Sequence, residues 1–381
     1  MGNISSRRHN PHIPAHIDQK QLPPGIYFDH RKGDGRWYTL TRDETGCQRR
    51  RNVANHAAAL SDLRKIVEEN VEENRGTLKW LSDEFQRSEQ FKALTPSTRR
   101  GYQIHCDVLC HFPTKIGPLG NLDINKFSSA LIQRIVDKIG RDKPSTAVHC
   151  LQYLRRLLQW GKNRGHCNEN PARKIELPKQ RKRRRLPEHT IMDALIAFAR
   201  ERGQRQRGEK GACPGYLWCV MEIGYLCRLR GIEVVTLTDG QWRADGLKTN
   251  RRKGSRDNIV RWNPRLQNAW NAAAARRDAI WAKKKFPAPL APEKRQLIVA
   301  DHGGPLQKSS LDTAYQRLIH MAIKENIIRP EERFGLHDLK RRGITDTPGT
   351  RAEKQEASGH REESMLDIYD FSVPMVEASA Q

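Results

Sequence analysis

Near the middle of the chain, a run of positive charge limits the folds that the chain can adopt. Six of the seven residues from 179 to 185 are Lys or Arg, and the run lies between Pro178 and Pro187. Such a segment has no apolar surface to bury, and its like charges repel one another. Because helical patterns precede and follow it, residues 176–188 are predicted to form a basic linker. At 381 residues the chain is long enough for about two or three domains, each with its own core.

The net charge of the chain narrows the class of its partner. The charge is +25 at pH 7, with a pI near 10.0, which indicates a polyanionic partner. Nucleic acid fits better than a membrane surface, because the sequence has no apolar run of about 18 residues and does not begin with a signal peptide. The eight cysteines are therefore expected to be reduced thiols, and the protein is expected in the cytoplasm.

The amino-terminal region, residues 1–65, predicts a small β domain. Its first 20 residues are polar and basic, include Arg7 and Arg8, and are expected to form a flexible arm. A helix is predicted from Asn55. A three-stranded sheet backed by a helix can place basic strands in a DNA groove, although a small sheet domain of another function fits as well. The predicted strands span residues 26–28, 36–40 and 48–53.

Residues 75–175 predict a helical domain, because apolar residues recur there with a helical period. Helices are predicted to begin near residues 78, 96, 125 and 145, and Thr95 to cap the second. The positions expected to face the core of the first two helices are Leu78, Leu81, Phe85, Ile104, Val108 and Phe112.

Two side-chain groups in this helical domain allow more than one interpretation. Cys106 and Cys110, with a histidine beside each, could be metal ligands, but their spacing on a helix favours small buried residues of a core. The candidate phosphate contacts are Arg99, Arg100, Arg155 and Arg156, each of which alone is more typical of a solvated surface charge.

The last region, residues 189–381, predicts a mainly helical domain with a small sheet. A strand pair is predicted within 242–263, and the predicted helices span residues 191–202, 215–230, 264–284 and 309–325. The fold class is therefore multidomain α+β, with a small three-stranded β amino-terminal domain, a helical domain, and a mainly α domain with a small β-sheet.

The chemically active residues of this region occur at defined spacing. They are Arg230 with Glu233 three residues later, Lys253 at the tip of the predicted hairpin, His337 with Lys340, Gly359-His360, and Tyr369 nine residues after His360. Arginine and histidine cations can stabilise the extra charge of a phosphorane. A tyrosine hydroxyl can attack phosphorus, and a lysine can protonate the departing 5′ oxygen. No cluster has metal-ligand spacing, so protein cations would replace a metal clamp.

In order and spacing these residues resemble the tyrosine recombinase family, specifically the phage-type, lambda-like integrases. The resemblance matches Arg230 to the family's first arginine, Glu233 to its structural partner and Lys253 to the hairpin lysine. It likewise matches His337 and His360 to the two histidines and Tyr369 to the nucleophile. The departure is Lys340, where the family has Arg, because lysine keeps the charge but lacks the planar fork. Arg341 is a poor substitute, because on a helix it would point about 100° away.

The resemblance implies a site-specific DNA recombinase that acts in integration and excision. Tyr369 would form a 3′-phosphotyrosine link, and Arg230, His337, Lys340 and His360 would hold the phosphate. Lys253 would protonate the 5′ oxygen. Neither ATP nor an essential metal is implied, so no cofactor is expected. Residues 189–381 would then be the catalytic domain.

The resemblance also implies how DNA and other proteins would be bound. Residues 1–65 resemble the arm-binding domain of such integrases, and residues 75–175 would bind the core site. A homotetramer would hold two duplexes at their attachment sites through a Holliday junction, with a host DNA-bending protein and an excision factor as further candidates. Residues 370–381 would dock on a neighbouring subunit. The candidate DNA-binding residues are Arg7, Arg8, Arg99, Arg100, Lys182, Arg183 and Arg184.

Two other functions remain open from the sequence. A type IB topoisomerase would use the same chemistry without exchanging DNA partners. A non-catalytic DNA-binding prophage remnant would retain the fold, with Lys340 as the inactivating change.

Overall fold

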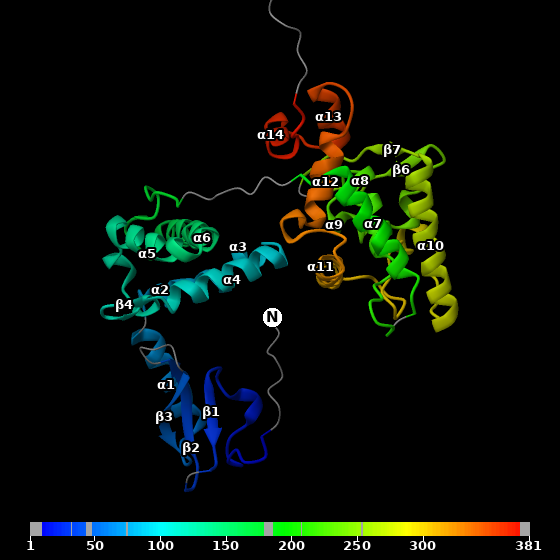
Figure 1. Ribbon diagram of the computed structural model, residues 1–381. Coiled ribbons are helices and arrows are strands. Elements are labelled where there is room, and N and C mark those ends of the chain that lie inside the picture. The colour runs from blue at the N-terminus through cyan, green and yellow to red at the C-terminus, as the bar shows by residue number, and fades with distance from the viewer. Residues whose placement is uncertain are drawn as a thin grey trace, which may run out of the picture. The chain divides into compact units, whose positions relative to one another are not determined.

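The computed structural model describes residues 10–31, 33–42, 48–73, 75–178, 186–206, 208–252 and 254–373 (Figure 1). Two compact units divide the chain, Met1–Lys182 and Arg183–Gln381. The division falls inside the predicted linker. The finer division of the first unit into domains 1–65 and 75–175 stays a prediction.

The amino-terminal sheet has three antiparallel strands in the order β1-β2-β3. Ile26, Phe28 and Trp37 point to one side, where they are buried with Leu63 of the following helix. That helix begins five residues later than predicted, because the third strand continues to Asn55 and a turn intervenes. The elements are β1 (Ile26–Asp29), β2 (Arg36–Arg42), β3 (Gln48–Asn55) and α1 (Leu60–Glu73).

The rest of the first unit is helical and encloses its own core. The elements are α2 (Leu78–Arg87), α3 (Glu89–Lys92), α4 (Pro96–Cys110), β4 (Pro113–Thr114), β5 (Gly117–Pro118), α5 (Ser129–Asp142) and α6 (Pro144–Lys162). As predicted, Thr95 caps α4, where its hydroxyl accepts a hydrogen bond from the Thr98 amide. The third predicted helix begins at Ser129 rather than Asn125, because Ser128 caps it.

The predicted inward face of α4 is wrong at Ile104, which is 52% exposed. The helix instead buries Cys106, Leu109 and Cys110, and a residue two positions before Cys106 lies about 200° around the axis. The cysteine pair is thus part of the core, with 3.7 Å between the two Sγ atoms. Among the described residues, no group of three His, Cys, Asp or Glu side chains could hold a metal ion.

In the second unit, helices surround α8, whose residues from Leu217 to Gly224 are all buried. The apolar side chains of α7, α10, α11 and α12 pack in the same core. The elements are α7 (His189–Gly203), α8 (Leu217–Leu226), α9 (Gly231–Val234), β6 (Gly246–Lys248), β7 (Ile259–Arg261), α10 (Pro264–Lys284), α11 (Lys308–Lys324), α12 (Leu336–Thr345), α13 (Arg351–Ser358) and α14 (Leu366–Tyr369).

The predicted helix 215–230 is wrong at its end, because α8 stops at Leu226. Arg228 has a φ of 54°, in the left-handed region that ends a helix. Arg230 therefore lies in extended backbone, where it precedes the short helix α9. The predicted strand pair exists but is short, confined to β6 and β7.

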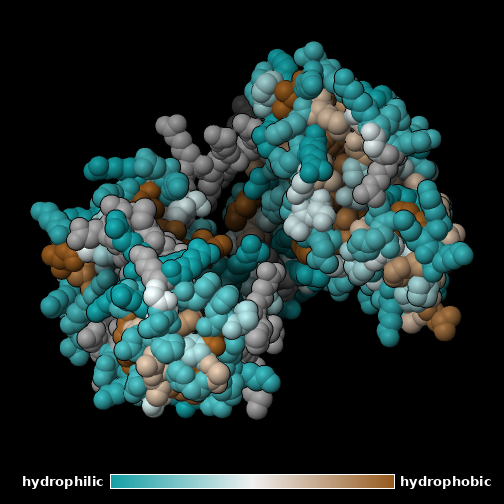
Figure 2. All heavy atoms as spheres, turned by 90° about the horizontal axis from the view of Figure 1, so that it is seen from below, coloured by the Kyte–Doolittle hydropathy of each residue, from teal (hydrophilic) through white to brown (hydrophobic). Residues whose placement is uncertain are grey.

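Short 3-10 turns connect the larger elements. They are η1 (Gln19–Gln21), η2 (Leu119–Asn121), η3 (Ile124–Lys126), η4 (Asp239–Gln241), η5 (Pro292–Lys294), η6 (Pro330–Glu332) and η7 (Glu363–Met365). On the face drawn in Figure 2, hydrophilic residues dominate and hydrophobic residues form only small scattered patches. In the part of the chain that the structure describes, no helix has the length and apolar character to span a membrane.

Candidate active site

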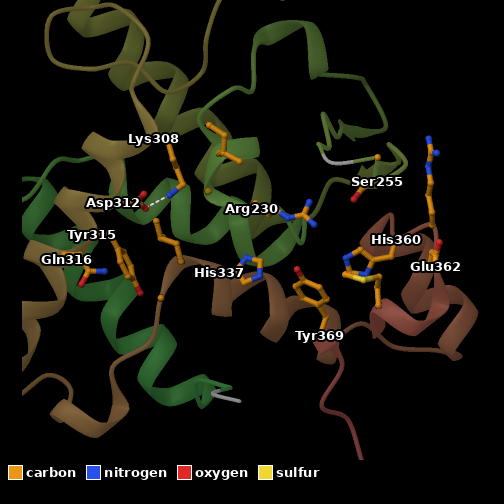
Figure 3. A pocket seen from close by; sticks show the side chains of 17 residues that line it. Arg230, Ser255, Lys308, Asp312, Tyr315, Gln316, His337, His360, Glu362 and Tyr369 are labelled. Carbon is orange, nitrogen blue, oxygen red and sulfur yellow. Dashed lines mark hydrogen bonds and ion pairs between the residues drawn. The ribbon is translucent and has the colours of Figure 1, made fainter. Parts of the chain in front are cut away.

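A pocket of about 840 Å³ opens in the second unit, lined by α9, α11, the start of α12 and the segment 360–369. Four of the predicted catalytic residues line it, and their side chains point toward one another in Figure 3: Arg230, His337, His360 and Tyr369. Residues from distant parts of the sequence thus converge within one chain.

Glu233 orients Arg230 from the first turn of α9. One oxygen of its carboxylate accepts a hydrogen bond from the Arg230 backbone N–H at 2.7 Å, and the other accepts one from the Arg230 guanidinium at 2.7 Å. Glu233 is completely buried. Burial acts to raise its pKa, but the hydrogen bond from Arg230 and the nearby charge of Lys340 lower the pKa below its ordinary value. An ionised carboxylate therefore fixes the direction of the arginine fork.

Tyr369 ends α14 and lies beside both histidines. Its ring centroid is 5.4 Å from that of His337 and 4.7 Å from that of His360. Burial acts to lower the pKa of Arg230, but Glu233 and the Tyr369 hydroxyl raise it above its ordinary value. The Tyr369 hydroxyl and the Arg230 guanidinium therefore lie near each other in the pocket.

The two histidines are neutral in the free pocket. Burial and the surrounding cations, Lys340 and Arg230 among them, lower the pKa of both His337 and His360 to about 4. His360 is 5% exposed, and within the described residues neither of its ring nitrogens has a hydrogen-bond partner. A buried polar group without a partner costs stability, which is typical of a group whose partner is a substrate.

Lys340 lies one turn after His337 on α12 but does not line the pocket. It is completely buried, and its Nζ lies 5.7 Å from the centroid of the Tyr369 ring. Among the described residues this Nζ has no hydrogen-bond partner. Burial, followed by the charges of Arg230 and Arg251, lowers the pKa of Lys340 to about 7. The lysine therefore supplies a titratable charge close to the Tyr369 ring. The adjacent Arg341 turns away and pairs with Asp338 at 2.7 Å.

Gly359 allows His360 to approach the strand pair closely. Its φ of 71° is left-handed, and a Cβ there would lie 2.3 Å from the Arg256 carbonyl oxygen. The Arg256 amide donates a hydrogen bond to the Gly359 carbonyl at 2.7 Å. On the other side of the loop, the Arg252 amide donates to Glu233 at 3.0 Å. The loop between β6 and β7 is thus attached to the residues around the pocket.

Several structurally important cations were not predicted from the sequence. Arg251 is buried, and its guanidinium donates to the carbonyls of Cys227, Arg228 and Ala357. Arg228 donates to the same Ala357 carbonyl at 3.0 Å. These contacts connect the end of α8 to α13. In the sequence, only the many arginines around residue 251 pointed to such contacts, and that density does not show which carbonyl groups the arginines bind.

The remaining predicted residues fall into two groups. Arg99 and Arg100 lie on α4, with Arg100 exposed, whereas the Arg155 guanidinium is occupied by the Ala172 and Ile175 carbonyls at 2.9 and 3.0 Å. Arg155 therefore has a structural role, and its prediction as a phosphate contact stays a prediction. Lys253, Arg7, Arg8, Lys182, Arg183, Arg184 and the end of the chain from residue 374 lie outside the described residues.

Comparison of the sequence with protein-family models and with curated proteins finds no match. Solved structures do match. A lambda integrase dimer bound to a COC′ core site gives a TM-score of 0.59 at 13% identity, and the alignment covers 95% of this chain and 99% of that one. A lambda integrase tetramer bound to a Holliday junction gives 0.56 at 13% identity, with 93% and 99% covered.

A second kind of integrase matches over a shorter length. The Tn1549 transposon integrase in complex with circular intermediate DNA gives a TM-score of 0.59 at 13% identity, covering 78% of this chain and 96% of that one. These matches show that the chain has the tyrosine recombinase fold in its lambda-like integrase form. They confirm the predicted fold class, including the amino-terminal sheet.

Proposed function

We propose that this protein is a site-specific DNA recombinase that cuts and rejoins DNA through a 3′-phosphotyrosine intermediate. The observation that carries the proposal is the convergence of Tyr369, Arg230, His337 and His360 in one pocket of one chain. The fold supports it, because proteins of this fold have been solved on a core site and on a Holliday junction.

The first step is attack by Tyr369 on the scissile phosphate. The phenolic hydroxyl releases its proton to water as its oxygen forms a bond to phosphorus, and the bond from phosphorus to the 5′ oxygen breaks. Arg230 donates to the non-bridging oxygens from the orientation that Glu233 sets. His337 and His360, both neutral, can each donate one N–H to these oxygens. The buried charge of Lys340 stabilises the developing negative charge without contact.

Protonation of the departing 5′ oxygen is assigned to Lys253, by resemblance to the family. The proximity of its neighbours supports this assignment, because Gly254 and Ser255 line the pocket. Because the phosphotyrosine keeps the energy of the broken bond, a 5′ hydroxyl from a second duplex can reverse the step and rejoin the DNA. The roles of all these residues are part of the proposal.

The assembly follows from the same proposal. Four protomers would hold two duplexes at their attachment sites and exchange strands through a Holliday junction, with residues 1–65 on separate arm sites and residues 75–175 on the core. Arg99, Arg100 and the basic residues of 1–20 and 179–185 would contact phosphates, which position the protein without reading sequence. A host DNA-bending protein and an excision factor would assist.

A plasmid assay tests the chemistry without knowledge of the attachment site. Purified protein is incubated with negatively supercoiled plasmid in EDTA, and covalent protein–DNA adducts are measured after detergent. We expect adducts and relaxation from the wild type and none from Tyr369→Phe. Tyr315→Phe is the matched control, because Tyr315 lines the same pocket but its hydroxyl donates to the Phe334 carbonyl at 3.2 Å.

Three outcomes would contradict the proposal. Equal adduct formation by wild type and Tyr369→Phe would assign the cleavage to another group. Absence of adducts from both, under conditions in which both shift the plasmid in a gel, would favour the non-catalytic DNA-binding protein. Relaxation without strand exchange, once the attachment site is mapped, would favour a topoisomerase.

A further inference from the structure

The segment that carries Tyr369 is tied to α13 by a buried ion pair. The Lys354 ammonium donates to both oxygens of Asp370, at 3.0 and 3.2 Å, and to the Ser372 hydroxyl at 2.8 Å. It also donates to the Thr345 carbonyl at 3.3 Å. The side chains of Lys354 and Asp370 are 9% and 12% exposed. Asp370 directly follows the nucleophile, so this pair determines where the end of α14 lies.

The helix that carries Lys354 is itself attached to the body of the unit. One turn after Lys354, the Ala357 carbonyl accepts hydrogen bonds from Arg228 and Arg251 and from the Asn258 amide group at 2.9–3.0 Å. These donors come from the turn after α8 and from the loop between β6 and β7. These hydrogen bonds hold α13, and with it Lys354, in place, and the ion pair holds Asp370 next to Lys354.

Other contacts of the tyrosine segment are few among the described residues. The apolar contacts form a small cluster of Ile344, Leu366 and Tyr369, with Met365 partly buried beside it. The Thr345 hydroxyl donates to the Tyr369 carbonyl at 3.4 Å and accepts from the Phe371 amide at 3.1 Å. Because this apolar cluster is small, the Lys354–Asp370 ion pair contributes a large share of the interactions that hold the Tyr369 segment in place.

We propose that Lys354 and Asp370 form a latch that keeps Tyr369 in the pocket of its own chain, so that the tyrosine and the cations that assist it come from the same protomer. Both are positioning residues, because neither touches the phosphate. The inference rests on the proposed role of Tyr369 as nucleophile. Breaking the latch leaves one nearly buried charge without its counter-ion, which strongly favours release of the segment into water.

An exposed ion pair between the same two segments provides a matched control. Arg351, on α13, pairs with Glu363 and with Asp367 of α14. The side chains of Arg351 and Asp367 are 45% and 65% exposed. An exposed pair of this kind contributes little. Asp367→Asn and Asp370→Asn are thus the same chemical change on the same short segment, and only the second breaks the latch.

The first test needs no DNA. In a Tyr369→Cys background, the rate at which iodoacetamide labels the introduced thiol is measured by mass spectrometry of its peptide. We expect Asp370→Asn to increase that rate at least about tenfold and Asp367→Asn to change it less than about twofold. Equal labelling rates in the two variants would overturn the latch. Ser372→Ala removes one hydrogen bond without leaving a charge unpaired, so a smaller increase is expected should Asp370→Asn fail to fold.

The second test asks which chain supplies the nucleophile. Tyr369→Phe, which keeps the pocket, is mixed with Arg230→Gln, which keeps the tyrosine, and adducts on supercoiled plasmid are measured. We expect no adducts while the latch is intact, and adducts when Asp370→Asn is added to the Arg230→Gln chain. Adducts from the first mixture, or none from the second, would overturn the proposal. Faster labelling together with no adducts from the wild type would instead leave the latch standing and refute the recombinase function.

Discussion

Lys340 and Lys354 are two buried lysines of the same unit with opposite surroundings. Lys354 donates hydrogen bonds to Asp370, Ser372 and Thr345, whereas the Lys340 Nζ has no partner among the described residues. A buried charge with partners is structural, and removing one partner is costly. A buried charge without hydrogen-bond partners reduces stability, so it points to a role other than holding the fold together, which we propose is long-range stabilisation of charge in the pocket. The difference separates a lysine that holds two segments together from a lysine whose charge has no structural partner among the described residues.

Replacing each lysine by methionine should move stability in opposite directions. Lys354→Met leaves the nearly buried Asp370 carboxylate without its counter-ion, so we expect the free energy of unfolding to fall by about 3 kcal/mol. Lys340→Met removes an unpartnered ammonium, so we expect a rise of about 2 kcal/mol at pH 7. Urea denaturation followed by circular dichroism measures both. A loss of stability in both variants would mean that Lys340 has a structural role as well.

The gain from Lys340→Met should also depend on pH. The pKa of Lys340 is lowered to about 7 in the folded protein, whereas in the unfolded chain it is about 10.4. The unfolded chain therefore binds more protons between these values, and the wild type gains stability as pH rises from 7 to 10. We expect the stability difference between wild type and variant to shrink over that range and to be constant below pH 7.

A substitution of Glu233 tests a charge that has a partner inside the pocket, because the Glu233 carboxylate orients Arg230. Glu233→Gln keeps the shape of the side chain but removes the charge that holds the guanidinium. We expect adduct formation to fall about a hundredfold, because a misdirected fork cannot meet the phosphate oxygens. Plasmid binding, measured by gel shift in parallel, should be unchanged. Weaker binding in proportion to the loss of cleavage would argue against a role in orientation.

The rate of adduct formation at limiting protein should fall above pH 7. Loss of the Lys340 proton removes the charge close to the Tyr369 ring, so we expect about a tenfold decrease per pH unit. The two histidines, with pKa values of about 4, are not expected to titrate in this range. Lys340→Arg should give a profile without this decrease, because arginine stays protonated. Identical profiles for the two proteins would exclude Lys340 as the titrating group.

The smallest effect is expected at the exposed pair. Arg351→Ala removes contacts to Glu363 and Asp367 that are open to solvent. We expect less than about 0.5 kcal/mol of lost stability in urea denaturation, and less in high salt. A loss as large as that of Lys354→Met would show that the whole of α13, rather than one buried pair, holds the tyrosine segment.

Local sequence patterns predicted the elements well wherever local rules decide them. The helix at 264–284 has the predicted bounds, because Asn263 caps it, proline is its first residue, and its apolar residues keep helical spacing. The position of Arg230 was missed because the left-handed Arg228 ends α8 early, and a non-glycine residue in that conformation gives no clear signal. Ile104 was misplaced because apolar residues lie on more than one side of α4.

The candidate site was predicted through the order and spacing of its motifs, and the structure brings four of those residues together. The contacts that support the site could not be predicted from the sequence. The pairing of Lys354 with Asp370 joins residues 16 positions apart, and the Arg251 guanidinium donates to the Ala357 carbonyl 106 positions away. Such partners depend on how helices pack, which side-chain type and spacing do not specify.

The attachment of the strand-pair loop has a consequence for how mutations combine. Arg252 is bound to Glu233, and Arg256 to Gly359, so the residues on both sides of position 253 are bonded to those that flank Arg230 and His360. A displacement of the Arg230 or the His360 side chain therefore also moves the loop between β6 and β7. Substitutions at positions 230, 253 and 360 should not have additive effects in a double-mutant cycle. A single substitution at one of these positions would then impair both protonation of the leaving group and binding of the phosphate, and a second substitution would add little.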